Sequence, residues 1–213
     1  GGLVLLPGVV ERALNKVHRG ALPPVDDATL ARHESLTIVD LHADTLLWSR
    51  DLLRRSRRGH LDLPRLEAGN VALQVFSSVT KTPRGMNYDA NDSDSDAITL
   101  LALAQRQAPR TWTSLLERSL HHARKLEAAA ERSRGRLRLI RTGPDLDRLL
   151  ADRAAGRRVT GALFSVEGLH NIEGEIGNLG RLVAAGMRMA GFVHFFDNEV
   201  AGSMHGLGKG ALT

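Results

Sequence analysis

Residues 36–44 read Leu36-Thr37-Ile38-Val39-Asp40-Leu41-His42-Ala43-Asp44, an apolar β-branched run followed by three ionisable side chains. The apolar run predicts a buried strand. Because side chains alternate along a strand, Asp40, His42 and Asp44 are expected to share one face. Such a cluster is costly to bury unless protons, hydrogen bonds or a metal compensate its charge, and imidazole and carboxylate are both zinc ligands. The stretch therefore predicts half of a metal site at the end of a strand.

The composition describes an ordinary globular chain with an excess of basic residues. Its 213 residues are 42% hydrophobic and 25% charged, enough for one domain with a sizeable core. The net charge is +5, with one dense arginine run at 54–58, but only 4% of residues are aromatic. Without stacking residues among the arginines, we expect a solvated basic surface and no nucleic-acid partner. The absence of cysteine excludes disulfides and thiolate metal sites.

Strand patterns alternate with helix patterns along the chain, which predicts a parallel α/β fold. A long polar segment at 81–96 is expected to be a loop. The expected strands cover 36–41, 70–77, 137–140, 159–166 and 187–193, and the expected helices cover 26–33, 97–107, 111–133, 145–155 and 179–185, with 45–58 partly helical.

Two further strands end in residues suited to catalysis. Glu167-Gly168 follows the apolar strand at 159–166, and His194 follows the strand at 187–193. A carboxylate at the end of an apolar strand needs a partner, and glycine beside it permits close backbone approach. In α/β barrels the active site lies at the carboxyl ends of the strands. These residues are therefore expected to meet the 40–44 cluster.

Other histidines have weaker claims. His170, like Glu167, follows the expected strand at 159–166, but it could simply cap the following turn. His205 lies in a glycine-rich loop near the site in sequence. His121 and His122 lie on a predicted amphipathic helix, where we expect them at the surface.

The chain resembles the membrane dipeptidase (renal dipeptidase) family of zinc metallopeptidases. The matching pieces are Asp40-Leu41-His42-Ala43-Asp44, Leu61-Asp62-Leu63-Pro64-Arg65-Leu66-Glu67-Ala68-Gly69-Asn70-Val71, Val166-Glu167-Gly168, and Gly186-Met187-Arg188 followed by His194. The resemblance implies a (β/α)₈ TIM barrel of the metal-dependent hydrolase type with two Zn²⁺ ions per complete site. It implies that His42 and Asp44 bind the first zinc, that Glu167 bridges both ions, and that His194 contacts substrate.

The implied activity is hydrolysis of dipeptides by a hydroxide held between two zinc ions. Glu167 and His194 are then the expected catalytic residues, with His194 donating a hydrogen bond to the oxygen on which charge accumulates. Asp40 is expected to orient the turn rather than to bind metal.

The family pattern extends beyond these residues. Two histidines for the second zinc, an arginine for the substrate carboxylate and a late aspartate are expected on later strands, and about five strands are counted where a barrel needs eight. Residues 31–213 are therefore expected to form the N-terminal portion of the barrel, and residues 1–30 a leading segment with a remnant of a signal sequence or membrane anchor plus a helix. We expect little or no dipeptidase activity from this polypeptide alone, and a homodimer at full length.

Two alternatives remain open from the sequence. One is another metal-dependent amidohydrolase, acting on a lactam or lactone, and the other is a degenerate barrel without catalysis. The expected location is the cell envelope, periplasm or a membrane anchor, and otherwise the cytoplasm.

Overall fold

One parallel sheet organises the residues that the computed structural model describes, which are 2–17, 20–21 and 23–212. Its strands are β1 (Ile38–Asp40), β2 (Val71–Ser78), β3 (Leu137–Leu139), β4 (Thr160–Glu167) and β5 (Met187–Gly191). The helices are α1 (Gly2–Leu14), α2 (Asp27–Glu34), α3 (Leu63–Ala68), α4 (Ala97–Ala104), α5 (Leu115–Arg132), α6 (Gly143–Ala154) and α7 (Gly177–Ala184), with 3₁₀ turns η1 (Thr45–Leu47), η2 (Pro109–Thr111) and η3 (Leu169–Ile172).

The strand order shows how far the sheet progresses around a barrel. β2 pairs with β1 on one side and with β4 on the other. β3 and β5 share the remaining edge of β4, with Leu139 opposite Ala162 near its start and Glu167 opposite Gly191 at its end. Five strands form, as expected, but β3 is a short side strand. The barrel progression is β1, β2, β4, β5, which is half of the eight strands of a closed barrel.

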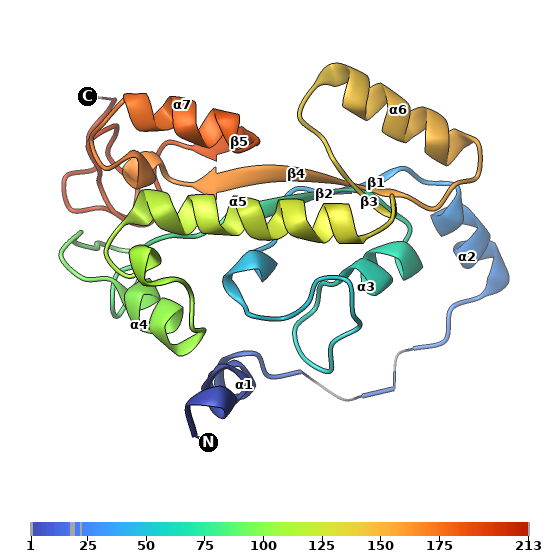
Figure 1. The fold of residues 1–213 in the computed structure, drawn as a ribbon, viewed down its shortest axis with the longest axis horizontal. Coiled ribbons are helices and arrows are strands. Elements are labelled where there is room, and N and C mark those ends of the chain that lie inside the picture. The colour runs from blue at the N-terminus through green and yellow to red at the C-terminus, as the bar shows by residue number, and fades with distance from the viewer. Residues whose placement is uncertain (1, 18–19, 22, 213) are drawn as a thin grey trace.

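Helix α5 supplies much of the core beneath the sheet. Figure 1 shows it running along the strands, with α6 and α7 above it in this view. Leu116 and Leu126 of α5 belong to the same buried cluster as Phe76 of β2 and Phe164 of β4. This packing fixes the strands, and therefore the direction in which their carboxyl ends point.

Local signals set most helix boundaries. Asp26 accepts a hydrogen bond from the amide of Thr29 to cap α2, and Ser114 caps α5 through the amide of Glu117. Thr142 and Asp145 form a reciprocal capping box at α6. The segment 45–58, expected to be helical or partly so, is helical only at η1. The remainder is a loop that closes onto α3, where Asp62 accepts the amide of Arg65 at 3.0 Å.

The prediction that His122 lies at the surface is wrong. His122 is 1% exposed, and its Nδ1 lies 2.8 Å from the Ser78 hydroxyl. It occupies the same helical face as Ser119 and Leu126, one turn away in each direction, and that face packs on β2. His121 is half-buried.

The leading helix α1 contacts the rest of the described chain through polar groups. Arg50 Nε lies 2.6 Å from Glu11 Oε1, and the Arg58 guanidinium donates to the carbonyl of Gly8 at 3.1 Å. Its Leu5 and Val9 side chains are exposed. Among the described residues, none of the helices combines the length and the apolar character needed to span a membrane.

Candidate active site

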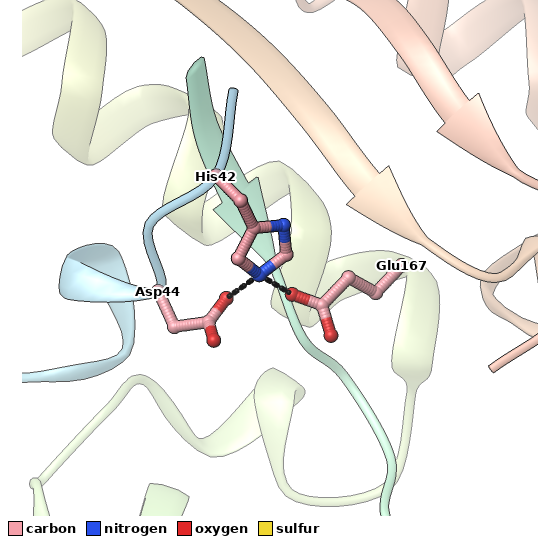
Figure 2. A group of neighbouring side chains, drawn as sticks. All are labelled: His42, Asp44 and Glu167. Carbon is pink, nitrogen blue, oxygen red and sulfur yellow. Dashed lines mark ion pairs between the residues drawn. The ribbon is translucent and has the colours of Figure 1, made fainter. Parts of the chain in front are cut away.

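Three side chains from two strand ends converge on one point. His42 Nε2 lies 2.8 Å from Glu167 Oε1 and 3.4 Å from Asp44 Oδ1 (Figure 2). One potential ligand atom from each residue lies within 4.8 Å of the others. The structure thus brings together the residues predicted to bind and bridge the metals, although Glu167 is 123 positions after Asp44 in the chain.

The loop after β1 positions His42 and Asp44. The strand ends at Asp40, so these two side chains are aligned by a turn and not by strand alternation. The Asp40 carboxylate accepts a hydrogen bond from the amide of His42 at 3.0 Å, which is the orienting role expected of it. The amide of Ser77 donates to the carbonyl of Ala43 at 2.9 Å. This bond holds the turn against β2 while the side chains of His42 and Asp44, the two predicted metal ligands, face Glu167.

The arrangement fits a divalent metal ion. The facing oxygens, Asp44 Oδ1 and Glu167 Oε1, are both inaccessible to solvent, and neither accepts a well-directed hydrogen bond from the described residues, although His42 Nε2 lies 3.4 Å from the first and 2.8 Å from the second. Buried carboxylate oxygens without a donor are costly, and a cation between them removes that cost. One imidazole nitrogen and two carboxylates form a ligand set that suits zinc among other first-row metals.

The surroundings of Glu167 oppose an unpaired negative charge. Burial, followed by the neighbouring Asp44 carboxyl group, raises the pKa of Glu167 to about 9. Gly168 follows with φ +91°, a left-handed conformation that favours glycine. A Cβ at this position would lie 2.6 Å from Nδ1 of His170. The close backbone approach expected of Gly168 is therefore present, and it lets the chain turn tightly beneath Glu167.

His194 faces the other oxygen of Glu167. Its Nε2 lies 3.2 Å from Glu167 Oε2, and its side chain is 20% exposed. Burial lowers the pKa of His194, which favours the neutral imidazole. Its backbone carbonyl accepts a 2.6 Å hydrogen bond from the hydroxyl of Ser203. The residue predicted to contact substrate therefore lies beside the residue predicted to bridge the metals.

His170 and His205, which were not predicted to belong to the site, lie outside the cluster of His42, Asp44 and Glu167. His170 is buried, with its Nε2 2.9 Å from the hydroxyl of Thr80, and burial lowers its pKa to about 3. It supports the turn at Gly168 and does not join the cluster of His42, Asp44 and Glu167. His205 lies further out, stacked on Phe195 at 5.0 Å between ring centroids.

Sequence reasoning missed two contributors to the site. Lys125 on α5 donates hydrogen bonds to the carbonyls of Leu46 and Trp48, and so fixes the η1 turn that follows Asp44. Phe195 packs edge-on against His194, with ring centroids 4.9 Å apart. Neither residue has a motif of its own, so only the folded arrangement identifies them.

Solved structures with a similar fold include metallopeptidases. They include dipeptidase AC, of family M19 (22% identity, TM-score 0.52, 75% of this chain and 43% of that chain). A metallopeptidase from Rhodobacter sphaeroides, liganded with a phosphinate mimic of the dipeptide L-Ala-D-Ala, shares 21% identity with a TM-score of 0.50. The match covers 74% of this chain and 45% of that chain. The probable dipeptidase PvdM from Pseudomonas aeruginosa shares 15% identity with a TM-score of 0.60. The match covers 84% of this chain and 40% of that chain. The chain thus spans less than half of each, and at these identities the likeness identifies the fold, here a partial TIM barrel.

Comparison with curated proteins finds no match. The model of one protein family, described as membrane dipeptidase (peptidase family M19), matches residues 28–209, which is most of the chain and includes every residue of the site described above. The chain therefore belongs to the membrane dipeptidase family, peptidase family M19.

Proposed function

We propose that residues 31–213 form the N-terminal portion of the catalytic barrel of a zinc-dependent dipeptidase. One observation carries the proposal: His42, Asp44 and Glu167 converge on one point while His194 meets the opposite oxygen of Glu167. Membership of a metallopeptidase family supports the same reading. Residues 1–30 are proposed as a separate leading segment.

Each side chain has a distinct proposed role. His42 and Asp44 would hold the first zinc ion, and Glu167 would be shared with a second. Bound zinc supplies Lewis acidity and lowers the pKa of water to near neutrality. The turn stabilised by Asp40 keeps the imidazole and carboxylate facing each other before any ion arrives, which reduces the reorganisation that binding requires.

His194 is proposed to stabilise charge on the substrate. Its Nε2 faces Glu167 Oε2, so in this arrangement a proton on Nε2 can be donated to the carboxylate. When Glu167 engages cations, we propose that the same N–H is donated to the carbonyl oxygen of the scissile amide. A neutral imidazole suits this role, because it donates without adding a positive charge beside the metal ligands.

Hydrolysis is proposed to need residues that this polypeptide does not supply. Among the described residues, one group of three metal-ligating side chains lies close together, and it provides ligands for one ion plus a bridge. The purified 213-residue chain is therefore expected to turn over dipeptides slowly or not at all. Turnover at the rate of a full-length family member would overturn this part of the proposal.

Metal binding can be measured directly on this chain. Zinc titration by calorimetry is expected to show a site that weakens at least tenfold in Asp44→Asn. Asp89→Asn, in the exposed loop at 81–96, is the matched control and should bind as the unaltered chain does. Equal zinc affinity in both variants would refute the proposed ligand set.

The substrate class can be tested on protein expressed from the full reading frame. A dipeptidase should hydrolyse a dipeptide with a free carboxylate and reject the same dipeptide with an amidated C-terminus. Hydrolysis of both, or of lactams and lactones in preference, would instead support the broader amidohydrolase reading. The same preparation tests the proposed homodimer through its mass in solution.

We also propose a location at the cell envelope, through a leading apolar segment. The exposed Leu5 and Val9 on α1 support this proposal. Fractionation of cells expressing the full reading frame tests it, and recovery entirely in the cytosolic fraction would contradict it.

A further inference from the structure

A continuous run of aromatic rings leads outward from His194. The His194 and Phe195 rings meet edge to face, with centroids 4.9 Å apart and planes at 90°. Phe195 stacks on His205 at 5.0 Å and 19°. Tyr88 completes the group, 5.8 Å from Phe195 and 5.5 Å from His205. We call Tyr88, Phe195 and His205 the aromatic wall.

Two loops that are distant in sequence build this wall together. Tyr88 comes from the 81–96 loop, and the other two residues follow β5. His205 Nδ1 lies 2.7 Å from the carbonyl of Tyr88, so this nitrogen must carry the proton and donate it. Buried Asn91 joins the loops again, because both its backbone amide and its side-chain amide donate to the carbonyl of His205, at 2.8 and 2.9 Å.

The second loop is also held firmly from within. The Asp197 carboxylate accepts the amide of Ser203 at 2.7 Å and the amide of Gly208 at 2.6 Å. Ser203 in turn bonds to the backbone of His194. These contacts place the aromatic wall at a fixed position relative to His194, as a specificity-determining surface requires.

The packing does not explain why the Tyr88 ring is exposed, whereas Phe195 and His205 are half-buried. Tyr88 is 78% exposed, although its ring contacts two other rings. Met204 and Leu207, which flank His205 in the chain, are 79% and 68% exposed. A firmly held apolar surface that adjoins a polar, partly buried charge cluster is typical of a ligand subsite.

We propose that the aromatic wall is a subsite for an aromatic side chain of the dipeptide substrate. This inference rests on the proposed function, because it takes His194 as the residue that meets the scissile amide. A substrate held there places a neighbouring side chain next to Phe195, which lies directly beyond His194. Ring-to-ring contact adds attraction beyond area burial, so the wall favours phenylalanine over alanine by about 3- to 10-fold in affinity.

Tyr88 is the sole tyrosine of the chain and therefore provides a specific reporter. In the zinc-loaded protein with labelled tyrosine, its ring resonances are followed by NMR during titration with Ala-Phe, Phe-Ala and Ala-Ala. We expect the ring signals to shift with at least one of the phenylalanine peptides and much less with Ala-Ala. Apparent Kd values come from backbone amide shifts, which remain measurable in variants without the tyrosine.

Substitutions then separate the wall from the metal site. Tyr88→Ala and Phe195→Leu should reduce the preference for phenylalanine to within twofold of unity, whereas Tyr88→Phe, the matched control, should retain it. Equal affinity for the three peptides, an unmoved Tyr88 ring, or an unchanged preference in Tyr88→Ala overturns the proposal.

The two hypotheses fail in different ways. If zinc binds and Asp44→Asn abolishes it, but the peptides bind equally, the subsite is wrong and the proposed metal site stands. If the aromatic preference is present in a protein that does not bind zinc, the subsite stands and the metallopeptidase proposal is wrong.

Discussion

Nε2 of His194 lies 3.2 Å from Oε2 of Glu167, while the other oxygen of Glu167 faces His42. The two oxygens of one carboxylate thus serve two different groups of residues. Strand pairing explains the geometry, because Glu167 is opposite Gly191 at the ends of β4 and β5, three residues before His194. The residue proposed to bridge the metals and the residue proposed to contact substrate thus lie at the ends of adjacent strands, and no further element is needed to bring them together.

Glu167→Gln should separate two effects of the Glu167 carboxylate, the destabilisation of the folded protein by its buried charge and its proposed binding of zinc. The uncharged amide removes the group whose carboxylate form is opposed by burial and by Asp44, so the metal-free variant should melt at the same temperature as the parent or higher. Zinc at about 100 times its Kd should stabilise the parent by about 2.7 kcal/mol and the variant far less. Thermal melts with and without zinc measure both effects. Equal stabilisation of the two proteins by zinc would contradict the bridging role.

Gly168→Ala should destabilise the protein by about 1–3 kcal/mol, because φ is +91° and a Cβ would meet the His170 ring. Gly180→Ala provides the matched control. Gly180 lies inside α7 with open space around its Cβ direction, so alanine there should stabilise by about 0.5–1 kcal/mol. Urea unfolding of both variants tests the pair. Similar small effects at the two sites would show that the turn beneath Glu167 tolerates a side chain.

Local sequence patterns predicted the parts of the fold that depend on neighbouring residues. The strand before Glu167 was expected from its apolar run, and the capping hydrogen bonds of Asp26 and Thr142 join residues only three positions apart. The burial of His122 could not be predicted, because the helix periodicity does not reveal that Ser78 of β2 lies opposite it. The side position of β3 has the same origin, since strand order is a property of long-range pairing.

In the candidate site, too, the sequence predicted some features, whereas those that depend on long-range contacts could not be predicted. Residue types at strand ends indicated His42, Asp44, Glu167 and His194 as a group, because parallel strands bring their carboxyl ends to one edge. His42 is aligned differently from expectation, because strand β1 ends at Asp40 and the Asp40 carboxylate accepts a hydrogen bond from the backbone amide of His42. Long loops carry no periodic signal, so their tertiary contacts, such as those of Tyr88, emerge only in the structure.

Arg118→Met should cost about 3–5 kcal/mol, because it leaves the partner of a buried ion pair uncompensated. Arg118 is 1% exposed and lies 2.6 Å from the Asp96 carboxylate, while also donating to the carbonyl of Thr80. Both partners border the 81–96 loop. Arg118→Lys should recover little of the loss, since an ammonium cannot reproduce the planar fork. Full recovery of the urea midpoint by lysine would contradict this account.

Because of Lys125, the free energy of unfolding should depend on pH in the alkaline range. Burial, followed by the positive charge of Arg50, lowers its pKa from 10.5 to about 8, and Glu11 opposes this shift. Below pH 8 the folded and unfolded states both carry the proton, so the cost of the buried charge is fully present. Between pH 8 and 10.5 the unfolded state binds more protons, and the stability therefore rises with pH by at most about 1.4 kcal/mol per unit.

Lys125→Met removes this titration, so the unfolding free energy of the parent minus that of the variant should increase from pH 7.5 to pH 10. Urea midpoints at several pH values measure the difference, and Lys16→Met, at an exposed lysine, is the matched control. Parallel curves for the parent and Lys125→Met would mean that the ammonium is stabilised by the carbonyls of Leu46 and Trp48 as well as it is by water. In that case the lysine that holds the η1 turn after Asp44 would titrate in the folded protein as it does in the unfolded chain.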